Sequence, residues 1–190
     1  MIFFTSDTHF NHRNIIKYCN RPFSSVEEHD TALVNNWNSV VSKGDTVYHL
    51  GDFACWFPEN TYLDRVENIL LKLNGNIIMI LGNHDKISLF SKLNKTWETF
   101  TLWQNTDLVL ETSDIKLYLN HYPQDLNVLS NKVDFHLHGH VHSKLDESNK
   151  SIMRLDVGVD SHNYRPISYD EVLAIYNSKI SNGAPSIAQR

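Results

Sequence analysis

A continuous apolar run passes directly into a polar sequence in the middle of the chain, where residues 77–85 read Ile-Ile-Met-Ile-Leu-Gly-Asn-His-Asp. The run lies between Gly75 and Gly82, a pattern typical of a strand that is buried on both faces. Side chains that directly follow such a strand lie at one edge of its sheet. We therefore expect Asn83, His84 and Asp85 at the carboxyl end of a central strand.

Two more strands are predicted to end in acidic residues, because residues 2–6 lead into Asp7 and residues 46–50 lead into Gly51-Asp52. Helices are predicted between the strands, over residues 11–20, from Ser24 or Ser25 to Val41, and from Asn60 or Thr61 to Leu73. This β-α-β-α-β order favours right-handed crossovers and a largely parallel sheet covered by helices.

The second half of the chain is predicted to be richer in hairpins. Residues 107–112 and 115–120 flank a Ser113-Asp114 turn and read as two paired strands. Further strands are expected over residues 135–138 and 152–159, and a closing helix over residues 169–177. The remaining residues, 178–190, are small and polar and are expected to form a frayed tail. Because no repeat or low-complexity linker divides the chain, we expect a single domain over residues 1–190.

Composition narrows the class of protein. The chain has 190 residues, of which 41% are hydrophobic and 21% charged, as in an ordinary globular domain with its own core. A net charge of −5 argues against long nucleic acid as a partner, since such binding usually leaves a basic face. The only cysteines, Cys19 and Cys55, form no disulfide framework, no apolar run reaches the length of a membrane span, and we expect no leader. We therefore expect a cytoplasmic protein without a membrane anchor.

Several polar motifs follow the predicted strands. Asp7 and His9 are two residues apart, which in an extended strand puts both side chains on one face, where both can contact one cation. Gly139 interrupts a histidine-rich strand, so that His140 and His142 can leave the sheet together. Each motif alone has a structural alternative: a solvated strand end, a turn before a helix, or a polar sheet face. Together, their carboxylate, imidazole and amide groups suit a divalent cation.

The order of these motifs resembles that of the calcineurin-like metallophosphoesterase superfamily. The pattern is Asp-x-His at residues 7–9, Gly-Asp at 51–52, Gly-Asn-His-Asp at 82–85, His121, and Gly-His-x-His at 139–142. The resemblance implies an α/β (α+β) fold, a β-sandwich of two mixed sheets with helices on both outer faces in four layers. It also implies a hydrolase of phosphoric esters.

The resemblance further implies a two-metal centre with assigned ligands. One ion would be held by Asp7, His9 and His142, the other by Asn83, His121 and His140, and Asp52 would bridge the two. His84 would stay off the metals and meet the substrate, while Asp85 is expected to orient the His84 ring. Mn²⁺ is the expected ion, with Fe²⁺, Zn²⁺, Mg²⁺ and Ni²⁺ as alternatives.

Charge balance supports phosphoester hydrolysis at such a centre. Two divalent ions bring about +4, two aspartates about −2 and a bridging hydroxide about −1, which leaves a slightly cationic site for a phosphate. Two ions about 3.5–4 Å apart would activate the water between them for in-line attack. We expect small phosphomonoesters or phosphodiesters as substrates, with nucleotides and cyclic nucleotides as candidates. The alternatives are a nuclease or repair phosphatase acting on nucleic-acid ends and a non-catalytic binding scaffold.

Further residues near the motifs are candidates for substrate contact or for support of the centre. The loop after the first strand is expected to lie next to the metals. It contributes three candidate substrate contacts, Asn11, His12 and Arg13. An exposed helix start would explain these residues as well. Asp156 and Asp160 are expected to support the centre or the fold and not to ligate metal. Trp56-Phe57 could stack on a nucleobase, and Tyr164-Arg165-Pro166 could be a rim contact or a turn before the last helix.

Overall fold

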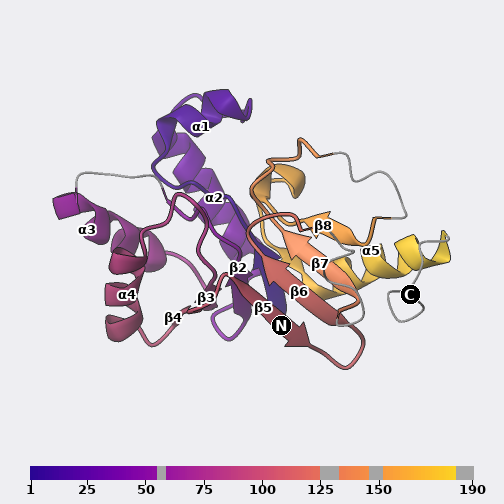
Figure 1. Cartoon of the computed structure of the whole chain (residues 1–190). Coiled ribbons are helices and arrows are strands. Elements are labelled where there is room, and N and C mark those ends of the chain that lie inside the picture. The colour runs from indigo at the N-terminus through magenta and orange to yellow at the C-terminus, as the bar shows by residue number, and fades with distance from the viewer. Residues whose placement is uncertain (55–58, 125–132, 146–151, 183–190) are drawn as a thin grey trace.

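The computed structural model describes residues 1–54, 59–124, 133–145 and 152–182. Two mixed β-sheets flanked by helices form the molecule (Figure 1), which confirms the fold expected from the sequence. The first half contains β1 (Ile2–Thr5), α1 (Arg13–Tyr18), α2 (Val26–Val40), β2 (Thr46–His49), α3 (Glu59–Leu70), β3 (Asn76–Met79), α4 (Ile87–Thr96) and β4 (Phe100–Leu102). The second half contains β5 (Asp107–Glu111), β6 (Lys116–Asn120), β7 (Phe135–His138), β8 (Arg154–Asp156), the 3-10 helix η1 (Val159–Ser161), β9 (Ile167–Ser168) and α5 (Tyr169–Ser181).

The first sheet has the strand order β4-β3-β2-β1-β9. Its strands β1 to β4 run parallel, which confirms the predicted alternation of strands and helices. The short strand β9 pairs antiparallel with β1 and makes the sheet mixed. Because β1, β2 and β3 end at the same edge, the three loops that contain Asp7, Asp52 and Asn83 start side by side.

The second sheet has the strand order β5-β6-β7-β8. The predicted hairpin is confirmed, since β5 and β6 pair antiparallel, whereas β7 runs parallel to both β6 and β8. The strand predicted over residues 152–159 is shorter than expected. The Gly158 N–H donates to Asp156 Oδ1 at 2.8 Å and turns the chain into η1.

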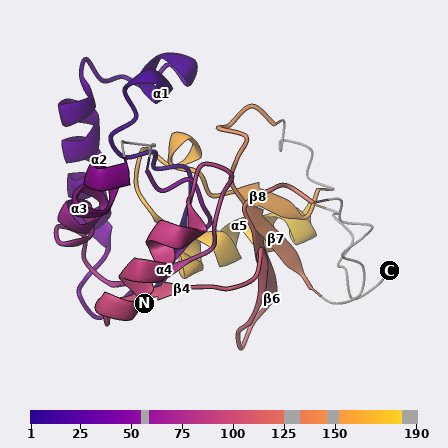
Figure 2. The same cartoon turned by 60° about the vertical axis from the view of Figure 1, so that its left-hand side comes forward.

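Two apolar clusters lie on opposite faces of the first sheet. Alternate residues of its strands, such as Phe3 and Val47, face the helices α2 and α3, while Phe4 and Tyr48 face the second sheet. Figure 2 shows α2, α3 and α4 gathered on one side of the molecule and the second sheet on the other. Helix α5 contributes Val172 to the second cluster. The core therefore fixes both sheets relative to one edge, where the motif loops emerge.

Some predicted boundaries shift in the structure. Ser25, not Ser24, is the N-cap of α2, since its Oγ accepts the Glu28 N–H at 3.1 Å. The tail predicted to fray from residue 178 is helical to Ser181, and Lys179 is buried with its Nζ donating to the Ile152 carbonyl at 3.0 Å. None of the described helices has the length and apolar character needed to cross a membrane. The pair Trp56-Phe57 lies outside the described residues.

Candidate metal centre

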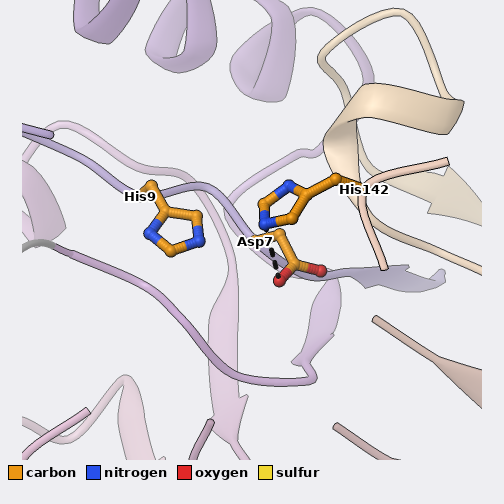
Figure 3. A group of neighbouring side chains, drawn as sticks. All are labelled: Asp7, His9 and His142. Atoms are coloured by element: carbon orange, nitrogen blue, oxygen red, sulfur yellow. Dashed lines mark ion pairs between the residues drawn. The ribbon is translucent and has the colours of Figure 1, made fainter. Parts of the chain in front are cut away.

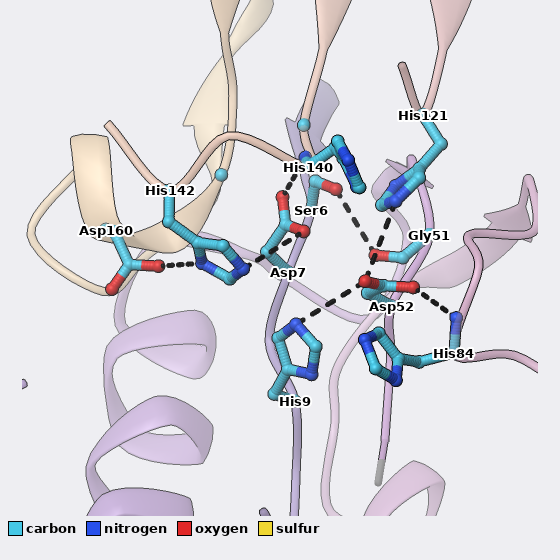
Figure 4. A network of polar contacts seen from close by, with 12 residues as sticks. Ser6, Asp7, His9, Gly51, Asp52, His84, His121, His140, His142 and Asp160 are labelled. Atoms are coloured by element: carbon cyan, nitrogen blue, oxygen red, sulfur yellow. Dashed lines mark hydrogen bonds and ion pairs between the residues drawn. The ribbon is translucent and has the colours of Figure 1, made fainter. Parts of the chain in front are cut away.

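Loops from both sheets bring the predicted ligands together at one edge of the sandwich. Figure 4 shows His9, His84 and His121 around Asp52, and His142 beside Asp7. The loop after β7 reaches the loop after β1, because the His140 N–H donates to Asp7 Oδ2 at 2.9 Å. The loop after β6 is joined as well, since the Gly139 N–H donates to the His121 carbonyl at 3.0 Å. Residues far apart in sequence therefore share one site.

The first group consists of Asp7, His9 and His142 (Figure 3), whose nearest ligand atoms all lie within 4.8 Å of one another. His142 Nε2 is 4.0 Å from Asp7 Oδ1. Asp7 and His9 are fully buried, and His142 is half-buried. The three residues predicted to hold one ion thus meet in the structure.

The second group consists of Asp52, His121 and His140, whose ligand atoms also lie within 4.8 Å of one another. His121 Nε2 is 3.6 Å from Asp52 Oδ2 and 3.0 Å from the amide oxygen of Asn83. Asp52 and His121 are buried, whereas Asn83 and His140 are exposed. The residues predicted for the other ion therefore also lie together, on the side of the site that is open to solvent.

Asp52, a member of the second group, also lies beside the first. Its Oδ2 is 3.5 Å from His9 Nε2 and 3.6 Å from His121 Nε2. Its other oxygen, Oδ1, accepts the His84 N–H at 2.8 Å, which fixes the carboxylate in this orientation. One carboxylate oxygen is thus available to both groups, as a bridging ligand would be.

The loops reach this arrangement through unusual backbone conformations. Asp7, His9, Asp52, His140 and His142 all have positive φ, between 48° and 71°. Such angles are uncommon for residues other than glycine and concentrate at functional sites. The expectation that Asp7 and His9 share the face of an extended strand is therefore wrong: β1 ends at Thr5, and left-handed turns bring the two side chains together.

Two glycines allow the loops to approach one another. A Cβ atom at Gly82 would overlap the Asp52 carboxylate, and one at Gly139 would overlap Ser6 Oγ and the Asp7 carboxylate. Any side chain at either position would displace a predicted ligand. The glycines of the Gly-Asn-His-Asp and Gly-His-x-His motifs are thus required by packing at the centre.

The donor atoms of the first group fit a cation. Asp7 Oδ1 and His9 Nε2 are buried and have no hydrogen-bond partner among the described residues. Burial raises the pKa of Asp7 to about 8, and burial lowers the pKa of His9 well below its usual range. A buried carboxylate and a neutral imidazole with free lone pairs are unfavourable alone, and a divalent ion would satisfy both.

Burial disfavours the charged form of the other three histidines predicted as ligands, His121, His140 and His142. Burial lowers the pKa of both His121 and His140. Burial acts in the same direction on His142, but its hydrogen bond to Asp160, at 2.8 Å, helps to raise its pKa to about 10. Asp160 thus contacts a predicted ligand without belonging to either group, in agreement with the supporting role expected for it.

Asp85 does not orient the His84 ring as expected. Its carboxylate accepts three backbone N–H groups, from Asp52 at 2.7 Å, Gly82 at 2.8 Å and Phe53 at 3.0 Å. Burial raises its pKa to about 7. Asp85 therefore holds the loop that carries Asp52. The half-buried His84 ring instead packs edge-on to the His9 ring, with 5.3 Å between centroids.

A pocket of about 460 Å³ opens beside the first group. It is lined by His84, and of the three candidate substrate contacts in the loop after β1 it includes only His12. Asn11 lines a different cavity, of about 330 Å³, and its N–H donates to Asp30, while the exposed Arg13 begins α1. Four further residues line the pocket and were not predicted as functional: Ile15, Tyr18, Cys19 and Lys144. Only Lys144 carried a signal, because it follows the last motif by two residues.

Comparison with known proteins identifies the family. The model of the calcineurin-like phosphoesterase superfamily domain matches residues 1–162. An uncharacterised protein of Methanocaldococcus jannaschii is 39% identical over 178 residues, which cover 92% of this chain and 90% of that protein. The gene 66 protein of Mycobacterium phage D29 is 27% identical over 197 residues, covering 93% and 96% of the two chains.

A solved structure shows a similar fold. The crystal structure of a protein of unknown function from Aquifex aeolicus superposes with a TM-score of 0.71 and 28% identity, covering 92% of this chain and 98% of that one. The match to the family model spans all the motifs described above. The chain therefore belongs to the calcineurin-like phosphoesterase superfamily, a metal-dependent family, and is a hydrolase that acts on phosphoric ester bonds.

Proposed function

We propose that this protein hydrolyses small phosphomonoesters or phosphodiesters at a centre for two divalent ions, with Mn²⁺ preferred. The observation that carries the proposal is the position of Asp52 Oδ2, between His9 Nε2 at 3.5 Å and His121 Nε2 at 3.6 Å. The mixture of carboxylate oxygen and imidazole nitrogen suits Mn²⁺, and equally permits Fe²⁺, Zn²⁺ or Ni²⁺, while Mg²⁺ prefers oxygen alone.

Each ion would have its own ligands. Asp7, His9 and His142 would hold the first, Asn83, His121 and His140 the second, and Asp52 both. Two such ions supply a strong nucleophile from water at neutral pH and offset negative charge on a phosphoryl group. The protein's part is to present these ligands in a fixed arrangement, which the buried Asp7 and Asp52 support.

His84 would act on the substrate without binding metal. Its backbone N–H is tied to Asp52 Oδ1, and its ring lies next to the His9 ring and at the pocket. A ring nitrogen in this position can donate a proton to the leaving oxygen or hydrogen-bond to a phosphoryl oxygen. The loop hydrogen bonds of Asp85 would assist indirectly by holding Asp52 in place.

The pocket favours a small substrate. Its volume of about 460 Å³ lies within the range of small-ligand sites, and the Lys144 side chain adds a positive charge. Tyr18, which is 64% exposed, offers a flat aromatic surface next to His12, with 6.3 Å between the ring centroids. A nucleotide or cyclic nucleotide would use both features, the ring against Tyr18 and the phosphate towards the histidines.

The proposal is tested by assaying aryl phosphate mono- and diesters with Mn²⁺, Mg²⁺, Zn²⁺ and Fe²⁺ in turn. We expect turnover that depends on added metal, is highest with Mn²⁺ and is lost in Asp52→Ala. Wild-type activity no higher than that of Asp52→Ala with every metal would contradict the proposal. A cytoplasmic location stays a prediction and would be checked by fractionation.

A further inference from the structure

The guanidinium group of Arg21 is buried directly behind the first group of ligands. Its side chain is fully buried, and all five of its N–H donors have an acceptor. The acceptors are Asp160 Oδ1 at 2.8 Å, Asp160 Oδ2 at 2.7 Å, the Asp7 carbonyl at 2.8 Å, the Thr8 carbonyl at 3.1 Å and His29 Nε2 at 2.7 Å. A buried charge is tolerated only when it is paired and hydrogen-bonded in this way.

Asp160 connects Arg21 to His142, and Figure 4 shows its contact with the His142 ring. Its Oδ2 accepts both the guanidinium and His142 Nδ1, the latter at 2.8 Å. Because Nδ1 is engaged by a carboxylate, the other ring nitrogen, Nε2, is the one that faces Asp7 Oδ1. Asp160 thereby selects which nitrogen of His142 points into the centre.

Arg21 also holds the loop that carries Asp7. It binds the carbonyls of Asp7 and Thr8, and the first of these belongs to a residue with positive φ. Since His29 Nε2 accepts from Arg21, its Nδ1 donates to Asp30 Oδ1 at 2.8 Å. Asp30 in turn accepts the N–H of Asn11 at 2.9 Å, and Asn11 is the third residue of this loop with positive φ, after Asp7 and His9.

Asp160 could instead be read as a metal ligand, since Cys19, His142 and Asp160 also have ligand atoms within 4.8 Å of one another. The position of Arg21 argues against this reading. Both oxygens of Asp160 receive guanidinium N–H groups, so a cation bound to Asp160 would lie against a buried positive charge. The carboxylate is therefore committed to Arg21 and to His142.

We infer that Arg21 and Asp160 are positioning residues of the metal centre: the ion pair between them holds Asp7 and His142 in the arrangement that binds the first ion. The inference rests on the proposed two-ion centre. Partners that orient a metal-binding histidine typically change metal affinity by about 10–100-fold when they are removed. The same effect is expected here, confined to one of the two ions.

The test is a calorimetric titration of the metal-free protein with Mn²⁺, with Asp160→Asn as the variant. Asparagine keeps the shape of the side chain but removes its charge. We expect the affinity of one site to fall by about 10–100-fold while the other site keeps its wild-type affinity. Arg21→Lys, which keeps the charge but not the planar fork, should weaken the same site.

Glu171→Gln is the matched control. It removes the charge from another Arg–carboxylate pair, Arg165 Nη2 to Glu171 Oε1 at 2.7 Å, away from the centre. Its Mn²⁺ affinities should stay within about twofold of wild type, because the pair contacts Pro166 and Ser168 and none of the predicted ligands. Thermal melting in EDTA reports whether each variant folds. If Asp160→Asn does not fold, the metal affinities of Arg21→Lys decide the outcome.

Three results would overturn the inference, and only the last of them would also refute the proposed centre. Wild-type affinity at both sites in a folded Asp160→Asn or Arg21→Lys variant would refute the positioning role alone. An equal loss at both sites would do the same, because it would indicate a general structural effect. Failure of the wild-type protein to bind Mn²⁺ would refute the proposed centre and the inference with it.

Discussion

The two groups of candidate ligands are held in place by different kinds of contact. Asp7 and His142 are fixed by side chains, since Arg21 binds the Asp7 carbonyl at 2.8 Å and Asp160 binds His142 Nδ1 at 2.8 Å. His121 is fixed by the backbone, through the contact of its Nδ1 with the Leu50 carbonyl at 2.7 Å. Its neighbours His140 and Asn83 are exposed.

This difference has a consequence for metal binding. A buried ligand whose orientation is already set loses little conformational freedom when an ion binds, whereas an exposed side chain must first be ordered. The ion proposed for the first group should therefore bind more tightly. The ion proposed for the second group should exchange more readily and lie nearer to solvent and substrate.

Substitution of Asp52 tests whether one carboxylate serves both proposed ions. Because Asp52 Oδ2 lies beside both His9 and His121, Asp52→Asn should weaken both proposed ions and lower turnover by about 10³-fold, the upper end for loss of one electrostatic contact at a reacting centre. Turnover is measured with an aryl phosphate, and Asp114→Asn, at an exposed hairpin turn, is the control. An Asp52→Asn variant as active as Asp114→Asn would rule out a shared ligand.

The variant His84→Ala tests whether catalysis can be lost without loss of metal binding. His84→Ala should lower turnover by about 10²-fold, within the usual range for loss of a proton donor, while both Mn²⁺ affinities stay unchanged. Parallel rate and calorimetric measurements check this. Loss of a bound ion in this variant would mean that His84 is a ligand.

Paired histidine variants sharpen the contrast between the groups. His142→Ala should weaken the tighter Mn²⁺ site by at least about tenfold, since even the partners of a ligand have effects of that size. His140→Ala should leave the tighter site unchanged and weaken only the other. The comparison would fail if His140→Ala removed the tighter site.

Mn²⁺ should also stabilise the fold. At about 100 times its dissociation constant, a bound ion adds about 2.7 kcal/mol, which corresponds to an increase in Tm of about 5–10 °C for a chain of this size. Differential scanning calorimetry with Mn²⁺ and with EDTA measures the shift. His142→Ala should lose most of the shift at the same Mn²⁺ concentration, and an undiminished shift would contradict the proposed role of this residue.

The smallest effect is expected at the half-buried pair Arg165–Glu171. The hydrogen bond from Arg165 lowers the pKa of Glu171 from 4.5 to about 2. A lowered pKa in the folded state stabilises the protein above pH 4.5, and this contribution is lost as the pH falls from 4.5 towards 2. Glu171 is 43% exposed, so the effect should stay below about 1 kcal/mol.

Denaturant melts of wild type and Glu171→Gln across this pH range test the expectation. The variant should lose less stability on acidification than the wild type does. Identical pH dependence in the two proteins would show that the ion pair contributes nothing.

The architecture and the identity of the candidate ligands could be predicted because both leave local signals. Where a buried apolar strand is followed by a polar motif, as at residues 77–85, the sequence itself predicts which side chains lie at the sheet edge. Strands β4 and β9 were not predicted, since three and two residues are too short to show alternation. Helix α4 was also missed, although Leu89, Phe90 and Leu93 have helical spacing.

The geometry of the centre could not be predicted because it depends on contacts between distant loops. The positive φ of Asp7 and His9 is accompanied by hydrogen bonds to the Gly51 and Asp52 carbonyls, which an extended-strand argument ignores. The carboxylate of Asp85 was assigned to its sequence neighbour, whereas the fold uses it for the Asp52 loop. Arg21 carried no signal, since its partner Asp160 is 139 residues away.

Anomalous diffraction at the manganese edge, from crystals grown with Mn²⁺, tests the two-ion centre most directly. We predict two peaks about 3.5–4 Å apart, one in contact with Asp7 and His142, the other with His121 and His140, and both in contact with Asp52. The peak beside His142 should persist after brief soaking in chelator, while the peak beside His140 should weaken first. A single peak, or peaks away from Asp52, would contradict the account.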